Sequence, residues 1–128
     1  MRNITFRTGW HRPHGGADST PEGAPSAYTV RRYVNEAIGG SAVIWFEAIS
    51  IVEEGRSSQT QLLLTRDTLD EFKKMTAAVK EAGIKANGYA PYLIMQANHS
   101  GRYSNPGNKP APDDRLPPPD SGAVPRRR

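Results

Sequence analysis

The sequence predicts an α/β fold in which three short strands alternate with two helices. The first observation is a series of short apolar runs that are rich in β-branched and aromatic residues. The second is that the segments between these runs repeat their apolar residues every three or four positions, as amphipathic helices do. Strands that alternate with helices pair in parallel, so their carboxyl ends meet at one edge of the sheet and carry the ligand groups.

The amino-terminal part of the chain predicts a strand, a loop and a helix. Residues 4–8, "ITFRT", are β-branched or aromatic at most positions, which favours a strand. Residues 10–25 are dense in Gly, Pro, His, Ser and Thr, which interrupt regular structure and indicate a loop. Ser26 is a suitable N-cap for the helix that follows, and Gly39 and Gly40 are expected to end that helix.

Two further strands and a second helix follow. Residues 41–52, "SAVIWFEAISIV", are almost continuously apolar, as expected of a parallel strand that is covered on both faces. The second helix is expected to have Asp67 as its cap and to end at Gly83. Residues 92–98, "YLIMQAN", have the length and the flanks of another buried strand.

The chain of 128 residues has the length of one domain, or of part of one. It contains no cysteine, which excludes disulfides, a thiolate nucleophile and cysteine-based metal sites. Its apolar runs are far shorter than the roughly 20 residues that span a bilayer. We therefore expect a soluble, cytoplasmic protein without a membrane partner.

The charge and composition also divide the chain. The formal net charge of +4 is modest, and no dense basic patch accompanies it, so no nucleic-acid partner is expected. Residues 1–112 are expected to form the domain. Residues 113–128 are crowded with proline and arginine, and Leu116 and Val124 are their only sizeable apolar residues, so this tail is expected to be disordered.

Polar side chains gather where the last strand ends. Gln96 both donates and accepts hydrogen bonds, so it can match the alternating carbonyl and N–H edge of a heterocycle. The alternative is a glutamine that bonds only to neighbouring backbone. His99 and Arg102 are able to hold anionic groups of a ligand, and equally able to pin their own loop.

Glu47 lies near the end of the second strand, where an unpaired carboxylate is costly. Either an arginine such as Arg7 or Arg56 neutralises it, or its pKa is shifted for chemistry. Of these two alternatives, the sequence favours structural pairing.

The sequence lacks the signatures of several enzyme classes. His11 and His14 have only one further histidine and few suitable acidic neighbours, so no metal site is expected. Ser100 adjoins His99, but no G-x-S-x-G motif surrounds it, which argues against a hydrolase triad. Neither a P-loop nor a G-x-G-x-x-G fingerprint is present.

Four short motifs occur in a fixed order around the expected elements. They are Gly39-Gly40 before the second strand, Glu47-Ala48 near its end, Glu54-Gly55-Arg56 in the loop after it, and Gln96-x-x-His99-x-Gly101-Arg102 after the last strand. In this combination, residues 1–112 resemble the amino-terminal part of the old yellow enzyme family. These are NAD(P)H:flavin oxidoreductases, which include enoate reductases and 2,4-dienoyl-CoA reductases.

The resemblance implies a fold and an activity. The family fold is a (β/α)8 TIM barrel, of which this chain would supply about three strand-helix units as an amino-terminal fragment. The family cofactor is FMN, NAD(P)H is the reductant, and the substrate is a small molecule with an electron-poor alkene, such as an unsaturated carbonyl or enoyl compound. The family residues that anchor the substrate and donate its proton lie beyond this chain, so no catalytic residue is assigned and the isolated chain is expected to be inactive.

The resemblance also implies binding residues. Gln96 would bond the polar edge of the flavin ring, and Ala48 would lie beside the ring. Thr8, Gly9 and Trp10 would supply backbone contacts near flavin N5. His99 and Arg102 are candidates for the adjoining loop or for substrate contact.

This sequence departs from the family pattern at two places. It reads "RTGWHRPHGG" after the first strand, where the family usually has Pro-Met, and it has several residues more between Gly83 and Gln96 than the family spacing. The alternative function is a non-enzymatic α/β interaction module that completes a sheet or barrel with another chain or with a further copy of itself.

Overall fold

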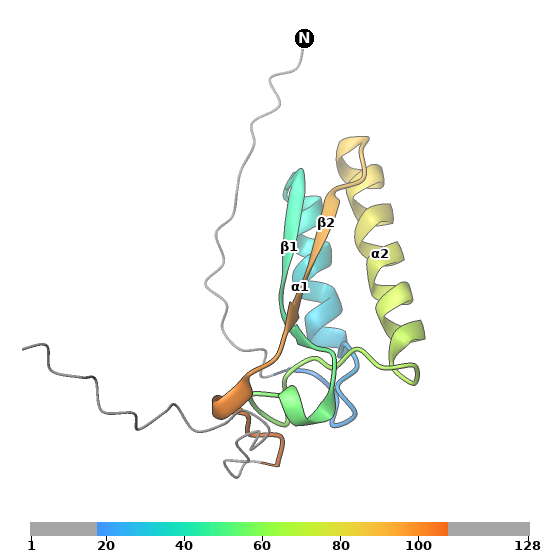
Figure 1. Cartoon of the computed structure of the whole chain (residues 1–128). Helices are drawn as coiled ribbons and strands as arrows, with labels where there is room; N and C mark the ends of the chain where they lie inside the picture. Colours follow the sequence, from blue (N-terminus) through green and yellow to red (C-terminus); the bar gives the residue numbers. More distant parts are fainter. Residues whose placement is uncertain (1–17, 108–128) are drawn as a thin grey trace, which may run out of the picture.

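The computed structural model describes residues 18–107 of the chain. They form a small α/β unit with two helices and a two-stranded parallel sheet (Figure 1). The elements are α1 (Ala27–Ile38), β1 (Val43–Ser50), a 3-10 helix (Glu53–Gly55), α2 (Leu69–Asn87), β2 (Tyr92–Asn98) and a second 3-10 helix (Gly101–Tyr103). The order helix, strand, helix, strand and the parallel pairing of the two strands are confirmed. The expected strand at residues 4–8 and the tail at residues 113–128 lie outside the described residues.

The start and the end of α1 are both those predicted. The Ser26 hydroxyl accepts a hydrogen bond from the backbone N–H of Thr29 at 3.3 Å, and the Thr29 hydroxyl accepts one from the Ser26 N–H. This reciprocal capping box satisfies amide groups that the first helical turn leaves without partners. At the other end the Gly39 N–H donates to the carbonyl oxygen of Asn35 at 2.9 Å, and Gly40 adopts a left-handed φ of 89°.

β1 contains a β-bulge. Its pairing with β2 shifts register between Trp45 and Ala48, so that Phe46 and Glu47 together stand opposite a single residue of β2, Met95. Both bulged residues are buried, whereas strict alternation would bury only one of them.

The bulge follows from packing against α1. The ring of Phe46 packs edge-on against the ring of Tyr33, with 4.6 Å between their centroids. The backbone N–H of Glu47 donates to the Tyr33 hydroxyl at 2.8 Å. Because the bulge resets the alternation by one residue, Ala48 pairs with Gln96, and both lie on the side of the sheet away from the helices.

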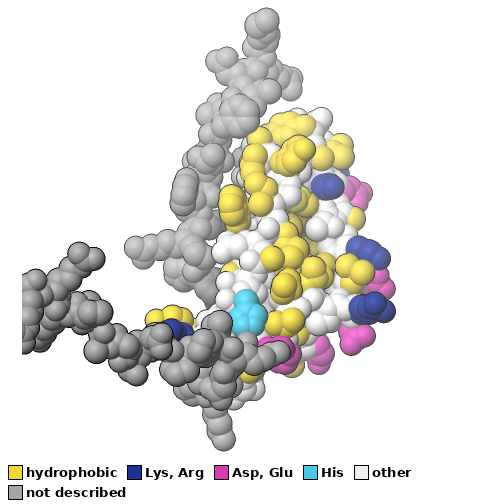
Figure 2. Space-filling view, viewed as in Figure 1, with side chains coloured by type: hydrophobic (Ala, Val, Ile, Leu, Met, Phe, Trp, Pro, Cys, Tyr) yellow, Lys and Arg dark blue, Asp and Glu magenta, His cyan; other side chains and the backbone are white. Residues whose placement is uncertain are grey.

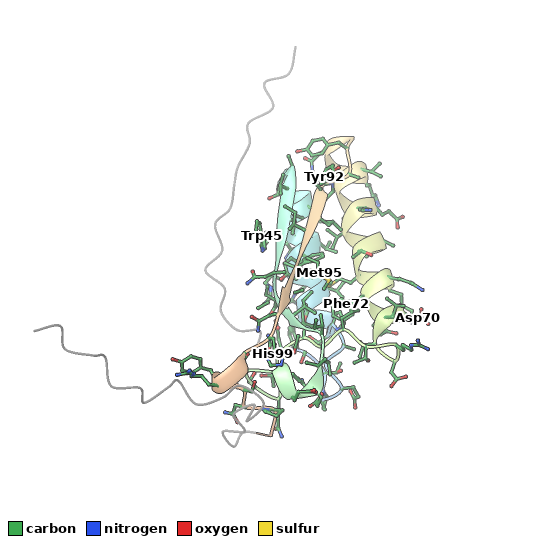
Figure 3. All side chains as sticks on the ribbon, viewed as in Figure 1. Trp45, Asp70, Phe72, Tyr92, Met95 and His99 are labelled. Carbon is green, nitrogen blue, oxygen red and sulfur yellow. The ribbon has the colours of Figure 1, made fainter. Side chains whose placement is uncertain are left out.

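Both helices cover the same face of the sheet (Figure 1). The core between them and the sheet consists of Tyr33, Ala37, Ile44, Phe46, Ile49, Leu62, Phe72, Met75 and Val79. Phe72 points from α2 towards the sheet, whereas Asp70, two residues earlier on the same helix, points to solvent (Figure 3).

The other face of the sheet is not covered by any of residues 18–107. We call it the open face; it comprises Val43, Trp45, Ala48, Tyr92, Ile94 and Gln96. Trp45 is 62% exposed and Tyr92 is 77% exposed. Figure 2 shows hydrophobic side chains along the two strands, with the side chain of His99 below them at the carboxyl ends of the strands. Within the described part of the chain, the expectation of a strand covered on both faces is therefore wrong, because the two helices supply only one covering layer.

The start of α2 differs by one residue from the prediction. Asp67 was expected to cap the helix, but Thr68 occupies the N-cap position. The Thr68 hydroxyl makes no cap bond and instead donates to the carbonyl oxygen of Leu63 at 2.7 Å. The backbone N–H of Thr65 donates to the same hydroxyl at 2.9 Å, so the Thr68 side chain stabilises the turn before the helix.

The sequence predicts that α2 ends at Gly83, but the helix ends beyond this residue. The helix continues to Asn87 and ends at Gly88, which has a left-handed φ of 82° and donates its N–H to the Ile84 carbonyl at 2.8 Å. Gly83 is instead a packing position, because a Cβ there would lie 2.6 Å from Cδ of Pro91. The extra residues before β2 therefore form one more helical turn and the loop that follows it.

Candidate functional site

The carboxyl ends of β1 and β2 bring two of the predicted site residues together. Ala48 and Gln96 are direct partners across the parallel pair, next to the bulge. Ala48 presents only a methyl group, so it leaves space on the open face beside the Gln96 amide. Parallel strands carry ligand groups at these ends in many α/β proteins.

Trp45 is a site residue that sequence reasoning did not identify. Its indole Nε1–H donates to Oε1 of Gln96 at 3.0 Å. An indole N–H only donates, so the amide oxygen, not the amide nitrogen, has to face it. Figure 3 shows Trp45 on the side of β1 away from α2. The sequence signal was an aromatic residue in a strand, which by itself does not reveal which polar group it meets.

The loops that follow the two strands are bonded to each other. The backbone N–H of Ser100 donates to the Gly55 carbonyl at 2.9 Å, and that of Asn105 donates to the Arg56 carbonyl at 2.8 Å. A Cβ on Gly55 would lie 2.9 Å from Cδ2 of His99, so a larger residue at this position would displace the His99 ring. The Glu-Gly-Arg motif and the His-x-Gly-Arg motif therefore form one structural unit.

His99 and Arg102 occupy different positions in this unit. Nδ1 of His99 accepts a hydrogen bond from the backbone N–H of Gly101 at 3.0 Å, which fixes the ring relative to its own loop. Gly101 has a left-handed φ of 56°, which suits the tight turn. Arg102 lies in the second 3-10 helix and is exposed.

Arg56 holds its own loop and does not contact Glu47. It is 2% exposed, and its guanidinium donates to the carbonyl oxygens of Gln59 and Gln61, the latter at 2.9 Å. It also pairs with Glu53 at 3.2 Å. The candidate pairing of Arg56 with Glu47 is therefore wrong; the other candidate, Arg7, lies outside the described residues.

The actual partner of Glu47 is Arg32 of α1. The Arg32 guanidinium bonds Oε1 of Glu47 and also Oδ2 of Asp18, the latter at 2.8 Å. The Tyr33 hydroxyl donates to Oε1 of Glu47 at 3.3 Å, whereas Oε2 of Glu47 is buried without a partner among the described residues. Burial raises the pKa of Glu47, and the charge of Arg32 opposes that rise. This cluster joins the segment before α1 to β1, so its role is structural.

The described part of the chain thus places the Gln96 amide on an apolar surface near the strand ends. Thr8, Gly9 and Trp10, together with the histidine pair His11 and His14, lie outside the described residues. Neither helix of residues 18–107 has the length and apolar character needed to cross a membrane. A comparison with models of known protein families finds no match to this chain, and a comparison with curated proteins finds no match either.

Proposed function

We propose that this chain forms the amino-terminal strand-helix units of an FMN-dependent NAD(P)H oxidoreductase of the old yellow enzyme type. The observation that carries the proposal is the pairing of Ala48 with Gln96 on the open face of the sheet. The motif resemblance requires a small residue and a glutamine at the carboxyl ends of neighbouring parallel strands. The motifs alone do not determine how the two strands are paired. The pairing of Ala48 with Gln96 therefore supports the proposal independently of the motifs.

The open face gives further support. In a (β/α)8 barrel, helices cover the outer face of the sheet and side chains fill the interior. The described unit has that asymmetry, because α1 and α2 cover one face and large apolar side chains such as Trp45 are exposed on the other. A barrel completed by further strands would bury them. The further strands of such a barrel would also extend the two-stranded sheet, and a sheet of only two strands is marginally stable by itself.

The residues present fit a flavin at the strand ends. Nε2 of Gln96 has no hydrogen-bond partner among residues 18–107, so it is available to the polar edge of a ring, and Ala48 leaves room for the ring beside it. Bound FMN would supply hydride transfer from NAD(P)H to an electron-poor alkene. In this chain Gln96 would orient the ring, while the bonded loops that contain Gly55 and His99 would hold the strand ends in register.

The competing function is a non-enzymatic module that completes a sheet with another chain. The exposed Trp45 and Tyr92 on the open face favour it as well, because a partner sheet or barrel would bury them. The two functions differ in whether the Gln96 end of that face binds a flavin.

A titration of the full 15N-labelled chain with FMN distinguishes them. We expect weak binding, with a Kd on the order of 1 mM, because none of the four motifs that carry the resemblance is a phosphate-binding loop, and a phosphate without such a loop forms few charge-assisted hydrogen bonds. The backbone amide signals of Ala48 and Gln96 should move most. Ribose 5-phosphate at the same concentration controls for binding of the phosphate alone, and Asn35→Leu, an exposed amide on α1, is the matched control for Gln96→Leu.

The flavin proposal requires Gln96→Leu to weaken binding and Asn35→Leu to leave it unchanged. Signals that move equally with ribose 5-phosphate, or that move only on α2, would exclude the flavin site and leave the interaction module as the remaining function.

A further inference from the structure

The hydrogen bond between Trp45 and Gln96 determines more than the position of the glutamine. A free glutamine amide can rotate to offer either its oxygen or its nitrogen to a ligand, so it accepts many partners. Here Oε1 of Gln96 receives the indole N–H at 3.0 Å. The indole has no acceptor to offer in return, so the opposite orientation would leave two donors facing each other.

This bond leaves a defined group for a ligand. The Gln96 amide nitrogen carries two N–H donors, and neither has a partner among residues 18–107. The amide oxygen is already engaged. The residue opposite Gln96 is Ala48, whose side chain forms no hydrogen bond and so cannot favour the opposite orientation of the amide.

We propose that Trp45 is a positioning residue that holds the Gln96 amide with its nitrogen free, so that the site recognises a ligand edge that presents a hydrogen-bond acceptor. The chemical class is a planar heterocycle with a carbonyl oxygen or an unprotonated ring nitrogen at that edge. A ligand edge that offers only N–H donors is rejected, because it would face the two N–H groups of Gln96. The ligand half of this inference rests on the flavin site proposed above, whereas the positioning half rests only on the Trp45–Gln96 bond.

The exposure of Trp45 makes the positioning half testable. The side chain lies on the open face and is 62% exposed, so Trp45→Phe should retain the fold while it removes the N–H donor. The side-chain amide signals of Gln96 in 15N-labelled full chain should move in Trp45→Phe. Tyr92→Phe is the matched control, because it alters an exposed aromatic on the same face, and it should leave these signals in place. Gln96 signals that stay unchanged in Trp45→Phe overturn the positioning role.

The ligand half is tested with FMN as the probe and with Gln96→Glu as the decisive variant. At neutral pH the glutamate carboxylate still accepts from the indole but has no donor for the ligand. We expect Gln96→Glu to lower FMN affinity at least about tenfold, and Trp45→Phe to lower it about three- to tenfold because the amide is then free to rotate. Equal FMN affinity of wild type and Gln96→Glu would show that the ligand does not take a donor from this residue.

The two proposals fail in different ways. If FMN moves neither the Ala48 nor the Gln96 backbone signal, the flavin function fails and the ligand half of the inference fails with it. If FMN binds there but Gln96→Glu retains the affinity, the flavin function stands and the donor assignment is overturned.

Discussion

At the scale of single residues, Glu47 shows how a buried carboxylate is accommodated. Its side chain is 6% exposed, and it receives one guanidinium and one hydroxyl hydrogen bond on the same oxygen. Burial raises the pKa of the Tyr33 hydroxyl, so this group stays protonated and remains a donor. The second carboxylate oxygen has no partner among the described residues. The hydrogen bonds and the ion pair therefore offset only part of the cost of burying the negative charge of Glu47.

This incomplete compensation predicts how Glu47 affects stability as pH changes. Burial raises the pKa of Glu47 in the folded state above its ordinary value of 4.5. The folded state then holds the proton of Glu47 more tightly than the unfolded state does. The resulting contribution to the free energy of unfolding is fully present below the pKa of Glu47 in the unfolded state, and it is lost as pH rises through the pKa of Glu47 in the folded state. The free energy of unfolding of wild type minus that of Glu47→Gln should fall as pH rises from about 4 to about 8.

Urea denaturation followed by circular dichroism at several pH values measures this difference. Glu81→Gln, an exposed carboxylate on α2, corrects for the loss of one negative charge. If the difference instead rises with pH, attraction to Arg32 outweighs the cost of burial.

At the scale of elements, two local irregularities set the geometry of the unit. The bulge in β1 turns both Phe46 and Glu47 towards α1 and thereby brings Ala48 onto the open face beside Gln96. Without it, strict alternation would place Ala48 on the helix side. The close packing of Gly83 against Pro91 fixes where the chain enters β2 after α2 ends. Both irregularities therefore position the candidate site.

The packing at Gly83 gives a second prediction. Alanine is favoured over glycine in a helix by about 1 kcal/mol, so Gly83→Ala would be stabilising if the site had space. A Cβ there would lie 2.6 Å from Cδ of Pro91 and 3.0 Å from the Tyr89 carbonyl oxygen, so we expect a net loss of about 1 to 3 kcal/mol in the free energy of unfolding.

Ala77→Gly, at an exposed position of the same helix, measures the helix propensity effect alone. Chemical denaturation of both variants tests the prediction. A Gly83→Ala variant more stable than wild type would mean that the loop through Pro91 moves aside without cost.

At the scale of the whole molecule, the open face is an apolar surface that the described residues leave exposed. Val43, Trp45 and Tyr92 contribute large side chains to it, and apolar surfaces of this kind mark sites of association. Their removal should cost little folding free energy, because the core lies on the other side of the sheet.

The third prediction concerns this surface. The double variant Val43→Lys and Tyr92→Glu, which places opposite charges on two paired positions, should reduce the fluorescence of 8-anilinonaphthalene-1-sulfonate bound to the chain by about half or more, because that dye reports exposed apolar surface. The free energy of unfolding should change by no more than about 0.5 kcal/mol. Ile84→Lys is the matched control, since Ile84 is an exposed apolar residue on α2. If Ile84→Lys lowers the dye signal as much as the double variant does, the open face is not the main apolar surface.

The sequence by itself determined the elements whose signals are local. The capping box of α1 joins residues three positions apart, so Ser26 and the glycines after Ile38 were sufficient to predict both ends of the helix. The apolar runs likewise predicted β1 and β2. Gly83 misled the prediction of the end of α2, because a glycine that ends a helix and one that admits a neighbouring proline look the same in sequence.

Only the tertiary structure decided which distant side chains meet. Arg32 and Glu47 are 15 residues apart, and Trp45 and Gln96 are 51 residues apart. Several arginines could have neutralised Glu47, and the choice of Arg32 depends on how α1 packs on the sheet. The contact of Trp45 with Gln96 depends on strand register, and that register includes a bulge that buries two consecutive residues against Tyr33. Such contacts are fixed by packing of whole elements, a free energy that no short stretch of sequence contains.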